Sequence, residues 1–163
     1  MAEPIAQQLI DTLSERELTL ATAETDTGGL IGHWITDIAG CSKVWIGGAS
    51  PYHNYPKIDL IGVSRDLLRE HGSVSEEAAV AMAHGVRETL NADIGVSETG
   101  ITGPTGGSES RPVGTVWMAC VGPGDRVHAE RQVWDSDREG NKRLTALRCV
   151  ELVLEAAQAS VDD

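Results

Sequence analysis

Three hydroxyl side chains and two glycines follow an apolar run near the start of the chain. Residues 22–29 read Thr-Ala-Glu-Thr-Asp-Thr-Gly-Gly, after the apolar run 18–21 and before the amphipathic stretch 30–35. Glycines permit a sharp turn and leave backbone N–H groups bare, and a following helix adds unpaired N-terminal donors. The segment predicts a pocket for a phosphate or a developing oxyanion. An ordinary strand, turn and helix with polar capping residues is the alternative.

Two further segments carry polar groups at the ends of apolar runs. Residues 99–107 read Thr-Gly-Ile-Thr-Gly-Pro-Thr-Gly-Gly, which suits a cavity wall of N–H and O–H donors better than a core. Tyr52, Asn54 and Lys57 follow the apolar run 44–49, so a phenol, an amide and an amine leave one strand end together. Ligands of open α/β sheets bind beyond the carboxyl ends of strands, where we expect all three segments to lie.

These segments resemble the CinA C-terminal domain family, whose stand-alone members include nicotinamide mononucleotide deamidases. The similarity extends over most of the chain, in one order and with family-like spacings. The matching positions are Ala23-Glu24, Thr27-Gly28-Gly29, Gly47-Gly48, Tyr52, Asn54, Lys57, Thr99-Gly100, Gly103-Pro104 and Pro112-Val113-Gly114-Thr115-Val116.

The resemblance implies an amidohydrolase that uses a hydroxyl nucleophile with a lysine and needs no cofactor. The hydroxyl attacks the carboxamide of nicotinamide mononucleotide, ammonia leaves, and water releases nicotinate mononucleotide. This chemistry requires a lysine that is neutral part of the time and donors for the oxyanion. The implied catalytic residues are Thr25 as nucleophile, Lys57 as base and Tyr52 as a proton relay or lysine-orienting group.

The resemblance also implies how the substrate is held. The backbone of residues 27–29 is the expected oxyanion hole, the loop after residue 99 the expected phosphate or ribose site, and Arg138 a phosphate contact. For Arg138, a surface ion pair with Asp137 is an equal alternative. The expected substrate-binding residues are Thr27, Gly28, Gly29, Asn54, Gly100, Thr102, Gly103, Pro104 and Arg138.

Two departures from the family pattern lie beside the expected reaction centre. Thr25 stands where the family has its nucleophilic serine, and its extra methyl group stiffens χ1. Asp26 stands where cysteine is usual, and its carboxylate would oppose an oxyanion or pair with Lys57. A non-catalytic nucleotide-binding or regulatory protein is therefore the main alternative. The Asp-Thr-Gly of residues 26–28 also matches aspartic proteases, but these need two carboxylates on an all-β scaffold.

The charge balance limits the classes of partner. The formal net charge is −12, whereas nucleic acids require clustered cations and anionic membrane surfaces attract basic segments. We therefore expect no nucleic-acid or membrane partner. A small anionic substrate is compatible with this charge, because salt screens exposed charges beyond ~8 Å.

Cysteines and apolar runs bear on metal and location. Cys41, Cys120 and Cys149 are scattered, without metal-binding spacing, so we expect a reducing compartment and no metal site. The first residues lack the features of a secretory signal, and no apolar run reaches the ~20 residues of a membrane span. The expected location is the cytoplasm.

Alternating elements predict one three-layer α/β/α domain over residues 1–163, with a mixed, mostly parallel sheet. Trp34 and Trp45 are candidates for a subunit contact in a homodimer or higher homo-oligomer. Ser64 and Ser75 are expected N-caps, and a capping box at 136–139 is expected to open the last helix. The expected helices are 4–16, 28–38, one that begins within 52–57 with Pro56 near its first turn, two after Ser64 and Ser75, and one after 136. The expected strands are 18–24, one from 44, 94–99, 114–121 and 126–134.

Overall fold

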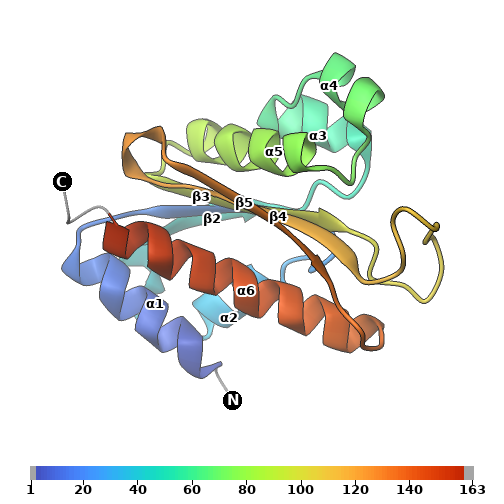
Figure 1. The fold of residues 1–163 in the computed structure, drawn as a ribbon. Coiled ribbons are helices and arrows are strands. Elements are labelled where there is room, and N and C mark those ends of the chain that lie inside the picture. Colours follow the sequence, from blue (N-terminus) through green and yellow to red (C-terminus); the bar gives the residue numbers. More distant parts are fainter. Residues whose placement is uncertain (1–2, 160–163) are drawn as a thin grey trace.

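A five-stranded sheet of order β2-β1-β3-β4-β5 lies at the centre of the computed structural model, which describes residues 3–159 (Figure 1). β1 pairs in parallel with β2 and β3, whereas β3–β4 and β4–β5 are antiparallel. The strands are β1 (Leu20–Glu24), β2 (Trp45–Ala49), β3 (Ile94–Gly100), β4 (Thr115–Val121) and β5 (Val127–Val133).

The expected layered α/β fold with a mixed sheet is confirmed, but the sheet is not mostly parallel. Within residues 3–159, parallel and antiparallel pairings are equally frequent. The segment 101–114 contains no helix that would carry the chain back across the sheet. A parallel neighbour of β3 needs such a crossover, so β4 runs antiparallel to β3. A hairpin then joins β4 to β5, which is antiparallel to β4.

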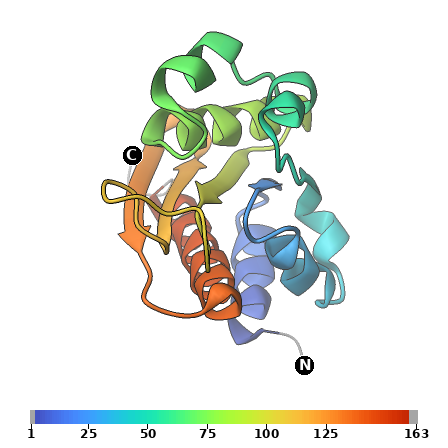
Figure 2. The same cartoon turned by 90° about the vertical axis from the view of Figure 1, so that its right-hand side faces the viewer.

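Helices cover both faces of the sheet (Figures 1 and 2). On one face lie α1 (Pro4–Glu15), α2 (Leu30–Thr36) and α6 (Arg138–Ala159), and on the other lie α3 (Asn54–Ile61), α4 (Arg65–His71) and α5 (Glu76–Thr89). Two single 3-10 turns, Cys41–Lys43 and Pro123–Asp125, complete the described elements. No helix within residues 3–159 combines the length and apolar character that crossing a bilayer requires.

The two layers of core differ in side-chain size. The larger core joins α1, α2 and α6 to the sheet through residues such as Leu9, Ile35 and Leu152. The α5 side is built from smaller groups, and a β-carbon on Gly95 would lie only 2.1 Å from the Ala83 carbonyl oxygen. α5 therefore lies very close to β3, which positions β3 and its carboxyl end firmly.

Local capping signals are confirmed at two helices and displaced at a third. Ser64 and Ser75 accept hydrogen bonds from Leu67 N and Ala78 N, as expected of N-caps. At α6 the expected capping box is wrong: the side chain of Asp137 accepts from Gly140 N at 2.8 Å. Asp137 directly precedes the first helical residue, so Asp137 and not Ser136 is the N-cap, and the bonded N–H is that of Gly140 instead of Glu139.

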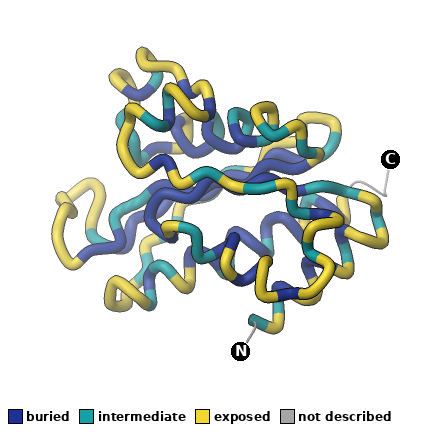
Figure 3. The backbone as a smooth tube through the Cα atoms, turned by 180° about the vertical axis from the view of Figure 1, so that it is seen from behind, coloured by how far each residue is buried: buried dark blue, intermediate teal, exposed yellow. Residues whose placement is uncertain are grey.

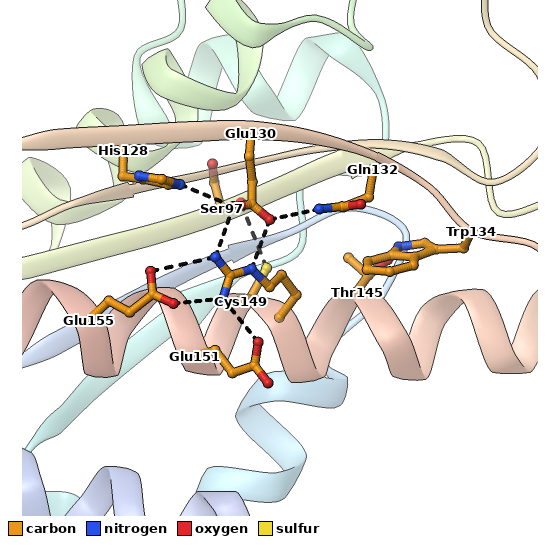
Figure 4. Close-up of polar contacts among 10 residues, drawn as sticks. Ser97, His128, Glu130, Gln132, Trp134, Thr145, Cys149, Glu151 and Glu155 are labelled. Atoms are coloured by element: carbon orange, nitrogen blue, oxygen red, sulfur yellow. Dashed lines mark hydrogen bonds and ion pairs between the residues drawn. The ribbon is translucent and has the colours of Figure 1, made fainter.

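Charged side chains fasten the edge strand β5 to α6 (Figure 4). Arg148 donates to both oxygens of Glu130 on β5 at 2.8 and 2.9 Å, and to Glu151 and Glu155 on its own helix at 3.0 and 2.7 Å. Hydrogen bonds from Arg148 hold the pKa of Glu130 at about 2. This network sets the position of α6, whose first turn reaches the carboxyl edge of the sheet.

Trp34 is buried in the larger core, so it does not offer a surface for the expected subunit contact. Trp45 is partly buried against the same core. In contrast, residues 104–112 of the loop after β3 are exposed throughout (Figure 3).

Candidate active site

Three polar loops meet at one edge of the sheet. The parallel register places Glu24 at the end of β1 beside Glu98 on β3, and Ala23 beside Ala49 at the end of β2. The loops that leave β1, β2 and β3 therefore emerge together, and Figure 2 views the molecule from this edge, with the loop after β3 (yellow) in front. This edge is the candidate site.

Glu24 fills the helix N-terminus that the sequence offers to an anion. Its buried carboxylate accepts hydrogen bonds from Gly29 N, Ile31 N and Gly32 N at 2.9–3.0 Å and from Thr27 Oγ1 at 2.7 Å. An acidic group at a helix N-terminus satisfies free N–H groups and interacts favourably with the dipole. The expected phosphate pocket of this segment is thus occupied by a side chain of the protein itself.

Glu98 holds the loop after β1 from the neighbouring strand. It is completely buried, and its Oε1 accepts from Thr25 N at 2.5 Å, Thr27 N at 3.0 Å and Thr27 Oγ1 at 2.9 Å. Burial, followed by the charge of Asp26, raises the pKa of Glu98 to about 7. Sequence reasoning gave no role to Glu24 or Glu98, although a glutamate at the end of each of two adjacent parallel strands was a visible signal.

The expected oxyanion hole has less free capacity than the sequence suggests. The N–H of Thr27 is bonded to Glu98 and that of Gly29 to Glu24. Among the contacts of the described residues, only the Gly28 N–H of this trio has no protein acceptor. Gly28 has a φ of +65°, a left-handed conformation that favours glycine.

Lys57 lies inside the protein and not on its surface. Its side chain is 1% exposed, and Nζ donates to Thr99 Oγ1 at 3.2 Å. Burial lowers the pKa of Lys57 below its ordinary value, although Glu98 and Asp26 act in the opposite direction. A lysine of this kind gives up its proton more readily than a surface lysine, as a general base requires.

Thr25 and Asp26 are buried at the same edge. Thr25 Oγ1 has no hydrogen-bond partner among the described residues, so it is not bonded to Lys57. Burial raises the pKa of Asp26, while Arg138 and Lys57 lower it. The pairing of Asp26 with Lys57 that would spoil the base is not formed as an ion pair within the described chain, and burial outweighs the effect of Asp26 on the pKa of Lys57.

Arg138 joins two of the expected site segments. It donates to the Gly103 carbonyl at 2.6 Å and to Tyr52 Oη at 3.4 Å. Tyr52 is half exposed and bonds Arg138 instead of Lys57. Asn54, the exposed first residue of α3, lines an open hollow together with Tyr52.

The loop after β3 closes against Asp26. Thr102 is buried, and its backbone hydrogen bond to Asp26 lowers the pKa of that carboxyl. A β-carbon on Gly100 would lie 2.9 Å from Asp26 Oδ2, so only glycine permits this approach. Gly103 has a φ of +85° and precedes Pro104, which is exposed.

A cationic cavity of about 470 Å³ lies between the first turns of α2 and α6. Three cations of α6 line it, Arg138, Lys142 and Arg143, against Leu30 and Trp34 of α2. Glu139 is the acidic member of the lining. The i, i+4 and i+5 spacing of the three cations is the sequence signal for this face of α6. Of the three, only Arg138 is a predicted site residue.

Comparison with known proteins decides the family. The family model "CinA C-terminal domain" matches residues 2–157. This chain belongs to the CinA C-terminal domain family.

Close relatives and solved structures agree with this assignment. A "CinA-like protein" of Salinibacter ruber is 48% identical over 141 residues, which cover 86% of this chain and 34% of that protein. A "putative competence-damage inducible protein" of Halothermothrix orenii is 46% identical over 133 residues, 82% of this chain and 32% of that protein. The chain thus spans about a third of the length of these relatives.

The crystal structure of the competence/damage inducible protein CihA from Agrobacterium tumefaciens matches with a TM-score of 0.90 at 35% identity, covering 93% of each chain. The competence damage-inducible protein A from Klebsiella pneumoniae matches with a TM-score of 0.88 at 26% identity, also over 93% of each chain.

The CinA domain offers proton-transfer chemistry at this edge. Within residues 3–159 no group of three or more His, Cys, Asp or Glu residues is arranged to hold a metal ion. A hydroxyl, a buried lysine and two buried carboxyl groups of raised pKa are instead brought together. The α/β scaffold, with α2 directly after the two glycines, differs from the all-β scaffold that the aspartic protease alternative requires.

Proposed function

We propose that this CinA domain is an amidohydrolase that converts nicotinamide mononucleotide to nicotinate mononucleotide and ammonia. The observation that carries the proposal is the burial of Lys57, which lowers the pKa of its amine. Lys57 lies at the sheet edge that also carries Thr25. The substrate itself comes from the family resemblance. The geometry supports the class of reaction.

The proposed reaction has two halves. Thr25 Oγ passes its proton to Lys57 Nζ and attacks the carboxamide carbon, and the C–N bond breaks as the leaving nitrogen takes the proton from Lys57. Water then attacks the acyl ester, gives a proton to Lys57, and releases the carboxylate as Thr25 regains its proton. Among residues 27–29, the Gly28 N–H is the backbone donor that has no acceptor within the described chain, and we propose that it donates to the oxyanion.

The cationic cavity supports a phosphorylated substrate. Its volume of about 470 Å³ falls within the range of small-molecule sites, roughly 300–1,000 Å³. Arg138 links it to Tyr52 and to the loop after β3. We propose that the substrate's phosphate lies beside Arg138 and Lys142, with its carboxamide toward Thr25.

Ammonia release from nicotinamide mononucleotide tests the proposal. We expect turnover by the wild type and loss of at least about 100-fold with Lys57→Ala, because the base is removed. Lys43→Ala, which changes an exposed lysine, serves as the matched control and is expected to keep full activity. Thr25→Ser is expected to be at least as active as the wild type. Absence of turnover in the wild type would contradict the proposal.

A non-catalytic nucleotide-binding protein is the second candidate. It is favoured by the Thr25 hydroxyl, which bonds neither Lys57 nor any other described group. In that case, calorimetric titration detects nicotinamide mononucleotide binding while the wild type releases no ammonia. Recovery of turnover in Thr25→Ser would then show that the scaffold still positions the substrate.

A further inference from the structure

Two carboxyl oxygens at the sheet edge are buried without a hydrogen-bond partner. They are Glu98 Oε2 and Asp26 Oδ2. A buried carboxylate oxygen that accepts no hydrogen bond is costly when the group is ionised, and a bound proton removes that charge. The two groups are neighbours, since the charge of Asp26 acts directly on Glu98.

The other carboxyl oxygen of Glu98, in contrast, accepts several hydrogen bonds. Oε1 accepts from the backbone N–H groups of Thr25 and Thr27 and from the Thr27 hydroxyl. These bonds fix the backbone on both sides of Asp26 and directly at the proposed nucleophile. A neutral carboxyl group can keep the two backbone hydrogen bonds, because its carbonyl oxygen has two lone pairs. The single hydroxyl hydrogen of Thr27 is shared between Glu98 Oε1 and Glu24 Oε2.

We propose that Glu98 is a positioning residue, whose Oε1 holds the loop of the nucleophile Thr25 while its Oε2 retains a proton in the working protein. The role of Thr25 as nucleophile rests on the proposed function. The positioning of the loop and the retained proton rest on the hydrogen bonds and the burial of Glu98. No role was assigned to Glu98 from the sequence.

The surrounding charges decide which carboxyl group keeps the proton. Burial raises the pKa of Asp26 as well, but the cations Arg138, Lys57 and Lys142 act on Asp26 in the opposite direction. Glu98 faces Asp26 and Glu24 from β1 and its loop, Lys57 from α3 and Cys149 from α6. Burial and the negative charge of Asp26 raise the pKa of Glu98 to about 7. Among the described residues Glu98 faces no cation but Lys57, so Glu98 is the member that holds a proton as the pH falls below about 7.

A proton on Glu98 also affects Lys57. The charge of Glu98 is the larger of the two influences that raise the pKa of Lys57 against the effect of burial. When Glu98 is neutral, that influence disappears and Lys57 becomes neutral at lower pH. The proton on Glu98 therefore favours the form of Lys57 that accepts the proton of Thr25.

Thermal unfolding as a function of pH tests the proton directly. A carboxyl group whose pKa is raised by folding holds a proton in the native state that the unfolded chain lacks, so stability falls as pH rises from the unfolded pKa to above the native one. Between pH 5 and 8.5 we expect the Tm of the wild type to fall by roughly 5–10 °C relative to Glu98→Gln. Glu88→Gln, at an exposed glutamate of α5, is expected to parallel the wild type.

Glu98→Gln and Glu98→Leu separate the two roles of the side chain. Glutamine keeps the acceptor at Oε1, and leucine removes it, so we expect Glu98→Leu to have a lower Tm than Glu98→Gln at every pH. If the Tm of the wild type and that of Glu98→Gln changed in parallel with pH, the proposal that Glu98 holds a proton would be overturned. Equal Tm values for Glu98→Leu and the wild type at pH 5 would overturn the positioning role.

Deamidase activity adds a measurement that a purely structural role leaves unchanged. In the pH profile of kcat, we expect Glu98→Gln to match the wild type below about pH 7, where Glu98 is neutral. Above pH 7 we expect Glu98→Gln to reach its plateau at lower pH than the wild type, because only the wild type gains a negative charge that keeps Lys57 protonated. Identical profiles above pH 7 for the wild type and an active Glu98→Gln would overturn the link to Lys57. If neither the wild type nor Thr25→Ser releases ammonia, the proposed function fails, and the Tm curves still decide the role of Glu98.

Discussion

At the scale of single residues, acidic side chains organise this site as much as the expected nucleophile and base do. Glu24 satisfies the N-terminus of α2, and Glu98 holds the backbone at Thr25 and Thr27. Gly28 and Gly29 let the backbone turn so that its N–H groups bond the carboxyl group of Glu24. Our proposal therefore places a ligand's phosphate elsewhere, beside the cations at the start of α6.

Glu24→Ala is expected to destabilise the protein by about 2–4 kcal/mol, because several buried donors lose a charged acceptor at once. Urea denaturation of both proteins at pH 7 measures the difference. Glu88→Ala, at an exposed glutamate, is the control and is expected to change the free energy of unfolding by less than about 0.5 kcal/mol. A similar small change in Glu24→Ala would show that the α2 N-terminus does not depend on this carboxylate.

At the scale of elements, the site depends on two fixed contacts. β3 is held against α5 by the absence of a side chain at Gly95, and the edge strand β5 is held against α6 by Arg148 and Glu130 (Figure 4). The first contact positions Glu98 and Thr99 on β3. The second contact positions the cations at the start of α6.

The Arg148–Glu130 contact predicts a specific response to acid. Hydrogen bonds from Arg148 lower the pKa of Glu130 to about 2, below its value of about 4.5 in the unfolded chain. The stability that this pair contributes is therefore present above pH 4.5 and is lost as pH falls toward 2. We expect Arg148→Met to be less stable than the wild type at pH 6 and to lose less stability between pH 5 and 3. Equal losses in chemical denaturation across this range would contradict the prediction.

At the scale of the whole molecule, the net charge of the chain and the charge of the cationic cavity between α2 and α6 have opposite signs. The chain has a formal charge of −12, yet Arg138, Lys142 and Arg143 gather at one cavity. Short-range contacts prevail there because distant surface charges are screened. The net charge of the chain opposes the approach of anions, and the proposed anion site is the cavity that these three cations line.

Lys142→Met is expected to weaken binding of nicotinamide mononucleotide about 5- to 10-fold, because it removes one cation from the cavity. Nicotinamide riboside, which lacks the phosphate, is the matched ligand, and its affinity is expected to remain unchanged. Calorimetric titration of both ligands provides the comparison. An equal loss for the two would place the phosphate away from Lys142.

Association into a homodimer or larger oligomer and a cytoplasmic location remain predictions at this scale. The buried position of Trp34 removes one of the two side chains from which association was argued. Light scattering of the purified chain measures its mass in solution directly.

The sequence by itself determined the order of the elements, the family and the edge of the sheet that carries the polar loops. These features depend on residues that are close in the sequence. They are the periodicity of the apolar residues, the capping residues such as Ser64 and Ser75, and the glycine-rich motifs. Even there, the N-cap of α6 is Asp137 and not the neighbouring Ser136 that the capping-box pattern predicts.

Only the tertiary structure decided the direction of β4, the burial of Lys57 and the roles of Glu24 and Glu98. Glu98 meets Thr25 across 73 positions of chain, and Lys57 meets Thr99 across 42. The charge state of a side chain depends on the solvent and the groups around it, and these are set by packing between distant segments. The residues of the site were therefore visible in the sequence, while their protonation and partners were not.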